Sequence, residues 1–162
     1  MNRLHKAPSD LPMIGPTRSR YRLEDQIGFV LRIAVQFHTA IFTSQMIEGL
    51  TQTQFATLSK LREVGHCSQT QLARLLVLDA ATTKGVVDRL ELRGLVVVGA
   101  DLQDRRRRVL SLTAEGIGLV QRAEVVAARI SEATLAALTA PERARLLHLL
   151  RRMTNADSDG ED

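Results

Sequence analysis

The sequence predicts a mainly α-helical fold that carries one small β-hairpin, and three observations lead to this prediction. Apolar residues recur at helical spacing through most of the chain between residues 23 and 153. Polar capping signals and glycines divide that stretch into separate helices. One β-branched run, residues 95–98, is followed by a charged tip and an apolar return at residues 109–112, which is the pattern of a two-stranded hairpin.

Polar caps and glycines delimit the helices in the first half of the chain. Residues 23–48 have the spacing of one long amphipathic helix, which ends at Gly49. Residues 51–54 read Thr-Gln-Thr-Gln, a capping box in which the threonine and the second glutamine satisfy each other's backbone N–H groups. The helix that this box opens stops before Gly65. A second box at residues 68–71 opens a short third helix.

The second half of the chain has equally clear helix boundaries. Asp79 is a good N-cap for a helix over residues 80–93, and Gly94 follows at the position that takes a left-handed backbone. After the hairpin, Thr113 caps a long helix that continues to about residue 138. Residues 139–142 then combine an N-cap, a proline and a glutamate at N3, and they open the last helix.

Two short helices joined by a tight turn and followed at once by a β-hairpin make a winged helix-turn-helix, in which the second helix reads DNA. The predicted organisation is a flexible basic arm (1–22), dimerisation helices (23–48 and 113–153), a winged helix-turn-helix DNA-binding domain (49–112) and an acidic disordered tail (154–162). The long first and last helices have apolar faces too wide for one small domain to cover. A homodimer would bury them, and packing within one chain is the alternative.

The charge distribution indicates a polyanionic partner. The formal net charge is +4, and it is +8 without the last eight residues, which hold four acids. Residues 84–108 contain seven bases and four acids, including four consecutive arginines. The aromatic residues all lie between residues 21 and 55, away from this run, whereas single-strand binders interleave aromatic and basic residues. Double-stranded DNA is therefore the predicted partner, and a merely solvated loop is the alternative for the arginines.

The predicted DNA contacts come from the starts of the third and fourth helices and from the hairpin. Threonine hydroxyls reach base edges or phosphates, alanines pack on thymine methyl groups, and the basic side chains supply charge. The candidates are Ser68, Gln69, Thr70, Ala80, Ala81, Thr82, Thr83, Lys84, Asp88, Arg89, Arg105, Arg106, Arg107 and Arg108. Asp104 is expected to orient a neighbouring arginine through a bidentate pair.

Several classes of protein and site are not expected. The sequence shows no nucleophile with its base, carboxylate pair or glycine-rich phosphate loop, so no enzyme is predicted. The histidines have no metal-binding spacing, and neither a metal nor a cofactor is expected. Without a stretch of 18 consecutive apolar residues or an apolar leader, the chain is expected to be cytoplasmic and to have no membrane span. Two alternatives stay open, a non-specific architectural DNA binder and a redox-responsive regulator that uses Cys67.

Two segments resemble a known family. Residues 72–73 with 87–96 are similar to the helix-turn-helix of MarR-family regulators, and residues 101–116 resemble that family's wing, an Asp-Arg-Arg tip followed by Leu-x-Leu-Thr and a glycine. The resemblance implies a homodimeric repressor of palindromic operators, released by a small phenolic or aromatic carboxylate ligand. It also implies that Asp79 and Asp104 steady the arginine that enters the minor groove, Arg106. Gly85 departs from the family, which often has a bulky or basic residue there.

A narrower resemblance concerns the effector. Residues 23–29 and 38–42 are similar to the first helix of nicotinate-catabolism repressors, which respond to hydroxylated nicotinic acid. An aromatic acid needs an apolar cleft with few polar groups. The candidate ligand residues are Arg32, His38, Phe42 and Phe55, with Phe37 also expected near His38. The alternative for His38 is a hydrogen-bonded core residue.

Overall fold

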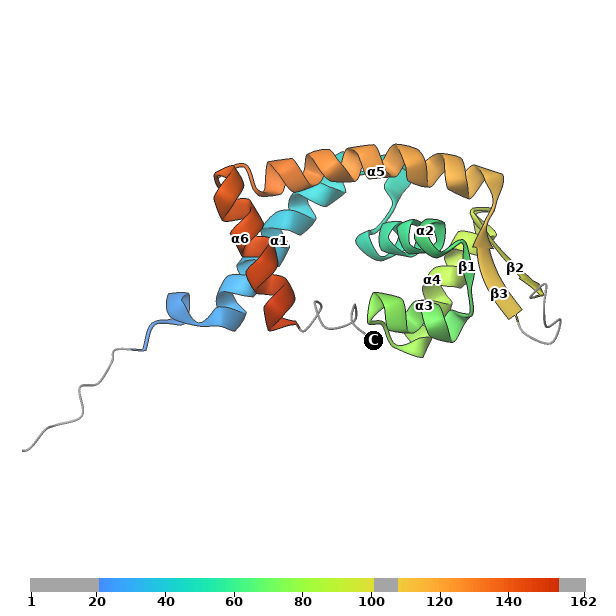
Figure 1. Ribbon diagram of the computed structural model, residues 1–162, viewed down its shortest axis with the longest axis horizontal. Helices are drawn as coiled ribbons and strands as arrows, with labels where there is room; N and C mark the ends of the chain where they lie inside the picture. The colour runs from blue at the N-terminus through green and yellow to red at the C-terminus, as the bar shows by residue number, and fades with distance from the viewer. Residues whose placement is uncertain (1–20, 101–107, 155–162) are drawn as a thin grey trace, which may run out of the picture. The chain divides into compact units, whose positions relative to one another are not determined.

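The computed structural model describes residues 21–100 and 108–154 and divides into two compact units, one up to Ala34 and one from Val35. It is mainly helical with a small antiparallel sheet, as predicted (Figure 1). In chain order the elements are the 3₁₀ turn η1 (Leu23–Asp25), α1 (Ile27–Gln45), the 3₁₀ turn η2 (Ile47–Gly49), α2 (Gln52–Val64), β1 (His66–Cys67), α3 (Gln69–Leu76), α4 (Ala80–Leu92), β2 (Val96–Ala100), β3 (Arg108–Leu112), α5 (Ala114–Thr134) and α6 (Ala140–Met153).

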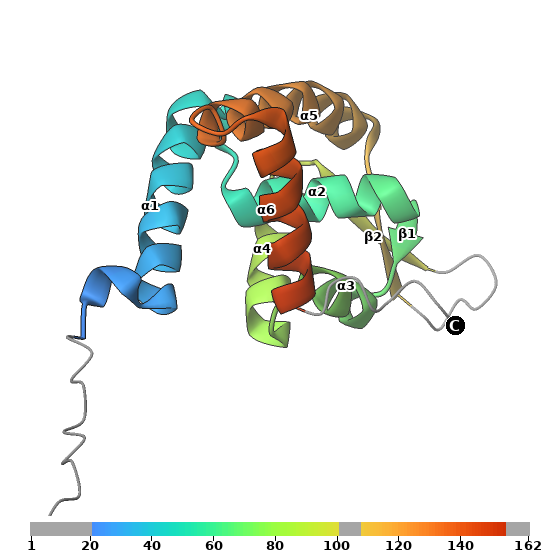
Figure 2. The same cartoon turned by 60° about the vertical axis from the view of Figure 1, so that its left-hand side comes forward.

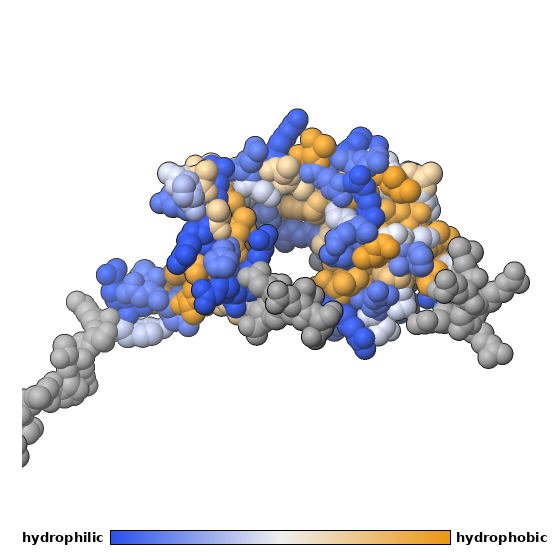
Figure 3. All heavy atoms as spheres, in the orientation of Figure 1, coloured by the Kyte–Doolittle hydropathy of each residue, from blue (hydrophilic) through white to orange (hydrophobic). Residues whose placement is uncertain are grey.

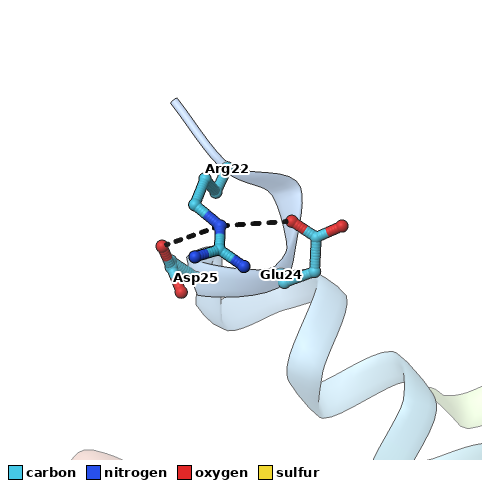
Figure 4. Close-up of polar contacts among 3 residues, drawn as sticks. All are labelled: Arg22, Glu24 and Asp25. Carbon is cyan, nitrogen blue, oxygen red and sulfur yellow. Dashed lines mark ion pairs between the residues drawn. The ribbon is translucent and has the colours of Figure 1, made fainter. Parts of the chain in front are cut away.

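The described part of the first unit contains η1 and the beginning of α1. Arg22 Nε lies 3.9 Å from a carboxylate oxygen of both Glu24 and Asp25, one on each side of the guanidinium (Figure 4). The side-chain oxygen of Gln26 accepts a hydrogen bond from the backbone N–H of Phe29 at 2.8 Å. It thereby satisfies one of the unpaired N–H groups in the first turn of α1. The predicted helix over residues 23–48 is therefore broken at its start, and η1 precedes the α-helix proper.

The second unit is built around α2. Figures 1 and 2 show α2 between α5 and the α3–α4 pair, and α2 packs on all three helices. The central side chains are fully buried aliphatic residues from every one of these elements: Leu58, Leu61, Leu72, Leu90 and Val120. This shared core fixes the turn between α3 and α4 against the rest of the unit, as a helix-turn-helix requires.

The sheet differs from the predicted two-stranded hairpin. It has three strands in the order β1-β3-β2, with His66 opposite Ser111 and Val96 opposite Leu112. The two-residue strand β1 is too short for alternation to reveal it, and only pairing with β3 makes it a strand. The prediction of residues 95–98 for the first hairpin strand was also short at one end, because β2 continues through Gly99 to Ala100.

The predicted helix caps are confirmed in most cases. Thr51 and Gln54 form the reciprocal capping box at 3.2 and 3.0 Å, and Thr139 with Glu142 forms the other. At α3, Ser68 Oγ accepts the N–H of Gln71 at 3.1 Å, but the side chain of Gln71 does not return a bond, so this second box is half formed. Gly94 has the expected left-handed backbone, with φ of 71°.

Two long helices were predicted too long. α1 ends at Gln45, and a separate 3₁₀ turn follows before the glycine stop. α5 ends at Thr134, four residues before the predicted end at residue 138, and a turn leads from there to α6. The prediction overran because the leucines of the turn, Leu135 and Leu138, continue the apolar spacing of the helix.

The surface carries many large apolar side chains. In Figure 3 apolar residues (orange) reach the surface on the face shown, interrupted by hydrophilic ones (blue). No residue of α6 is buried, and Phe42 is the only buried residue of α1. By length and composition alone α1 could cross a membrane, and the core helix of a soluble protein or a signal sequence passes the same test. Exposed apolar faces of this kind mark interaction surfaces in other proteins.

Candidate DNA-binding surface and ligand cavity

Asp79 holds the start of α4. Its carboxylate accepts the backbone N–H of Thr82 at 2.8 Å and the hydroxyl of the same residue at 2.6 Å. The hydroxyl bond is the main cause, and the N–H bond the second, of a pKa of the Asp79 carboxyl below its usual value of 3.8. The Asp79 side chain is therefore engaged within its own helix. Its predicted contact with the wing concerns Arg106, which lies outside the described residues.

Most of the predicted contact residues on α4 are exposed to solvent. The exposed members of the predicted set on this helix are Ala80, Ala81, Thr82, Lys84, Asp88 and Arg89. Thr83 is the exception, because its side chain is 1% exposed and its hydroxyl donates to the carbonyl of Asp79 at 2.8 Å. It shares the core-facing side of α4 with Val86 and Leu90. The prediction that Thr83 contacts DNA was therefore wrong.

Charged side chains on α4 are arranged in two groups. Lys84 Nζ lies 2.5 Å from a carboxylate oxygen of Asp88, one turn further along. The guanidinium of Arg89 lies over Gly85, with Nη1 3.6 Å from the point where a β-carbon on the glycine would stand. The position where the family often has a basic or bulky residue is therefore covered by the guanidinium of Arg89 instead.

A cleft of about 200 Å³ separates α4 from the two hairpin strands. Its lining includes Gln69 from α3, Lys84 and Asp88 from α4, and Arg108 from β3. The fold thus brings together predicted residues from three elements. Ser68 is half-buried and Thr70 is exposed beside them at the start of α3. The remaining wing residues of the prediction, Asp104, Arg105, Arg106 and Arg107, lie outside the described residues.

A second cavity, which we call the His38 cavity, has a volume of about 270 Å³. It is lined by His38, Phe42, Gln52, Phe55, Ala127, Ile130 and Ser131. The Phe42 ring lies 6.1 Å from both the His38 and the Phe55 rings, centroid to centroid. Three of the four predicted ligand residues therefore meet in one cavity, whose lining is part apolar and part polar. Phe37 was expected there, but its side chain is 55% exposed and does not line it.

Arg32, the fourth predicted ligand residue, lies in the first unit. Its Cζ is 5.1 Å from the centroid of the Phe29 ring, one turn earlier on α1. At this distance the guanidinium and the ring form a cation–π contact. A role of Arg32 in ligand binding stays a prediction.

The hydrogen bonds of His38 define its tautomer. Its Nδ1 lies 2.9 Å from the hydroxyl oxygen of Thr134, and that hydroxyl donates to the carbonyl of Ile130 at 2.8 Å. A hydroxyl has one proton, so Nδ1 of His38 must supply the proton of the first bond. In that tautomer Nε2 remains as an acceptor. His38 is half-buried, and it is both hydrogen-bonded to Thr134 and a lining residue of the cavity.

A third cavity, which we call the threonine-lined cavity, was missed by the sequence analysis. Its volume is about 390 Å³, and it is lined by Thr39, Phe42, Thr43, Met46, Gly49, Leu50, Thr51, Gln52 and Thr53. Phe42 and Gln52 line both this cavity and the His38 cavity. Gln52 Nε2 donates to the hydroxyl of Thr39 at 3.3 Å and so spans from α2 to α1. The capping box gave no sign that Gln52 would form this wall.

Cys67 is a buried thiol in the sheet. Its side chain is 2% exposed, and burial raises the pKa of the thiol above its ordinary value of 9.0. A raised pKa disfavours the thiolate, which is the reactive form. This environment does not support the redox alternative. Within residues 21–100 and 108–154, no three His, Cys, Asp or Glu side chains are grouped to hold a metal ion.

Comparisons with known proteins agree with this geometry. Residues 50–107 match the sequence model of the MarR family. The HTH-type transcriptional repressor NicR of Pseudomonas putida is 39% identical over 153 residues, covering 94% of this chain and 95% of NicR. A probable transcriptional regulator from Pseudomonas aeruginosa superimposes with a TM-score of 0.79 at 45% identity, covering 82% of this chain and 99% of that one. Bordetella bronchiseptica BpsR, in a structure on regulation of its DNA binding by 6-hydroxynicotinic acid, has a TM-score of 0.78 at 37% identity, covering 87% and 99%.

Proposed function

The chain belongs to the MarR family of transcriptional regulators, and from that premise we propose that it represses genes as a homodimer on a palindromic operator and is released by a small aromatic carboxylate. Transcriptional repression of the MarR type is established by the 39% identity with NicR along nearly the whole chain. Proteins of this family are DNA-binding regulators and not enzymes. The palindrome, the homodimer and the effector are the proposed parts.

The exposed start of α4 supports the proposed operator contact. Ala80, Ala81 and Thr82 form its solvent-facing first turn, Lys84 follows one turn later, and the guanidinium of Arg89 lies over Gly85. The N-terminal residues of a reading helix are the ones that contact base edges in the major groove. Gln69 and Arg108 would reach the phosphates from either side of the α4 cleft. Asp104 and Arg105 to Arg107 keep their proposed wing roles.

The uncovered helices support the proposed homodimer. Large apolar side chains on α1 and α6 are exposed by roughly 40–60% of their surface: Ile27, Val30, Ile33, Val35, Phe37, Leu147, Leu149 and Met153. The alternative, packing of these helices inside one chain, would leave buried residues on α6, and α6 has none. A second copy of the chain is the simplest cover, and its two-fold axis would match a palindromic operator.

The His38 cavity supports an aromatic acid as effector. Two phenylalanine rings and two aliphatic side chains line it, and His38 offers a hydrogen-bonding nitrogen beside the polar residues Gln52 and Ser131. That combination suits one ring with one or two polar substituents. The relative BpsR is regulated by 6-hydroxynicotinic acid, which makes a hydroxynicotinate-like acid our first candidate.

Operator selection tests the proposal directly. The full chain would be incubated with a random duplex library, and the selected sequences would be assayed for binding with and without 6-hydroxynicotinic acid. We expect a palindromic motif, one dimer per site and weaker binding when the acid is present. Equal affinity for selected and random duplexes would instead identify an architectural DNA binder. No response to the acid would remove the effector from the proposal and leave the operator in place.

The cellular location follows from the family. MarR-family regulators are cytoplasmic, and we propose that this protein is associated with the nucleoid through its operators. An exposed apolar α1 is explained by the dimer interface, so the proposal includes no membrane partner.

A further inference from the structure

Arg93 joins the end of the reading helix to a distant turn. Its Nη2 donates to the carbonyl oxygen of Glu48 at 3.0 Å, across 45 positions of the chain. Its own backbone N–H donates to the carbonyl of Arg89 and so closes the last turn of α4. Arg93 therefore belongs to α4 by its backbone and to the turn between α1 and α2 by its side chain.

The turn that receives this bond has an uncommon backbone. Glu48 has φ of 54° and ψ of 23°, and Gly49 has φ of 59°, so two consecutive residues are left-handed. A left-handed conformation is unfavourable for a residue with a side chain, and it persists where surrounding contacts hold it. The Arg93 guanidinium is one such contact. When a contact that holds such a turn is lost, the turn can adopt a different backbone conformation.

The same turn forms a wall of the threonine-lined cavity. Met46, Gly49 and Leu50 line that cavity, and Leu50 is also part of the core that holds α4. The threonine-lined cavity in turn shares Phe42 and Gln52 with the His38 cavity. A displacement of either shared side chain by a ligand would thus alter a space that the turn encloses.

We propose that Arg93 is a positioning residue that couples occupancy of the His38 cavity to the placement of α4. This rests on the proposed function, because the acid has to bind beside Phe42 and Gln52. Movement of these side chains shifts the turn, the Glu48 carbonyl moves with it, and Arg93 transmits the shift to the C-terminal end of α4. Coupling between two sites is reciprocal, so operator DNA bound to α4 must also alter the turn.

The reciprocal effect can be measured without any effector. Hydrogen–deuterium exchange of the peptide that covers residues 46–51 would be recorded with and without a selected operator duplex, in the full chain and in Arg93→Met. We expect the duplex to slow exchange in the wild type and to leave it unchanged in the variant. No effect of DNA on this peptide in the wild type, or an equal effect in Arg93→Met, would overturn the inference.

The effector response supplies the second measurement. The coupling factor is the ratio of operator Kd with saturating 6-hydroxynicotinic acid to operator Kd without it. We expect Arg93→Met to lower this factor by about three- to tenfold, the effect of losing one ordinary, solvent-exposed hydrogen bond. The Kd for the acid and the acid-free operator Kd should each change by less than about twofold. Arg93→Lys, which keeps a charged donor, should restore part of the coupling.

A matched control is available on α5. Arg122 Nη1 donates to the carbonyl of Gly118 at 3.1 Å, within its own helix, so Arg122→Met removes a similar bond that joins nothing to α4. This control should keep the wild-type coupling factor. A purely structural role for Arg93 would instead lower the thermal midpoint and weaken acid-free operator binding together, and that result would contradict the inference. If the acid fails to release wild-type protein, the proposed effector is wrong, and the exchange experiment still decides the role of Arg93.

Discussion

The backbone carbonyl of Leu95 occupies the space in which a side chain on Gly116 would begin. Leu95 follows α4, and Gly116 lies in the first turn of α5, so this contact fixes the start of α5 directly against the entry to the hairpin. The carbonyl of Leu95 also accepts the backbone N–H of Thr113 at 3.1 Å. A main-chain atom cannot move aside as a flexible side chain does, which makes position 116 specific for glycine.

Gly116→Ala should lower the free energy of unfolding by about 1–3 kcal/mol, because the added methyl group forces the backbone of Leu95 to move. The measurement is the free energy of unfolding from urea titrations. Gly118→Ala is the matched control in the same helix, since its β-carbon would meet only the end of the Arg122 side chain at 3.7 Å. That control should gain about 0.5–1 kcal/mol from the better helix propensity of alanine. Equal effects of the two variants would contradict the contact.

Val77→Gly should stabilise the protein. Val77 ends α3 with a left-handed backbone, φ of 52°, and its side chain is 91% exposed, so little burial is lost with it. Relief of the left-handed strain outweighs the extra chain entropy of glycine by about 0.5–1 kcal/mol. A thermal melt should show the gain, whereas Val77→Ala, which keeps a β-carbon, should show little of it. A lower midpoint for the glycine variant would refute this.

Asp79→Asn should alter the pH dependence of stability. Bonds from Thr82 lower the pKa of the Asp79 carboxyl in the folded protein, so the carboxylate contributes stability above the unfolded value of 3.8. That contribution is lost as the pH falls through the lower folded pKa. Asparagine keeps a neutral capping oxygen. The wild type should therefore be more stable than the variant at pH 6, and the difference should shrink below about pH 3.8. A difference that stays constant into that acid range would argue against the bonded carboxylate.

Lys84→Ala should weaken operator binding and flatten its salt dependence. The Lys84 ammonium lies at the solvent-facing start of α4, and loss of one phosphate contact lowers the slope of log Kd against log salt by about one. Titrations at several salt concentrations measure both effects. Lys60→Ala is the control, because Lys60 pairs with Glu63 on α2 and belongs to none of the proposed contacts. An unchanged slope for the Lys84 variant would remove Lys84 from the DNA interface.

His38→Leu should abolish most of the response to an aromatic acid while leaving operator binding intact. Leucine keeps an apolar wall but removes the hydrogen bond from the ring to the ligand, which should cost at least about tenfold in affinity. Calorimetric titration with 6-hydroxynicotinic acid measures this loss. The variant Thr134→Val removes the bond that orients the imidazole and should weaken binding less. Wild-type affinity in the leucine variant would exclude His38 from the ligand site.

Local chemistry explains what the sequence predicted well. The caps at Thr51, Asp79 and Thr139 depend on side chains bonding to backbone three residues away, so the information lies within one turn of the chain. Apolar spacing placed His38, Phe42 and Phe55 on core-facing sides of their helices, and the His38 cavity brings them together. A cap bonds to backbone close in sequence, and an apolar side chain needs only to lie on the inward face of its helix.

The sequence by itself determined the order of the helices, their caps, the hairpin and the basic character of the DNA-binding region, because propensity, periodicity and charge act over a few residues. The tertiary structure alone decided that Thr83 faces the core, that His66 and Cys67 form a third strand, and that Arg93 contacts Glu48. Each of these depends on two segments meeting that are far apart along the chain. No local preference encodes such a meeting, since it results from how the whole core packs.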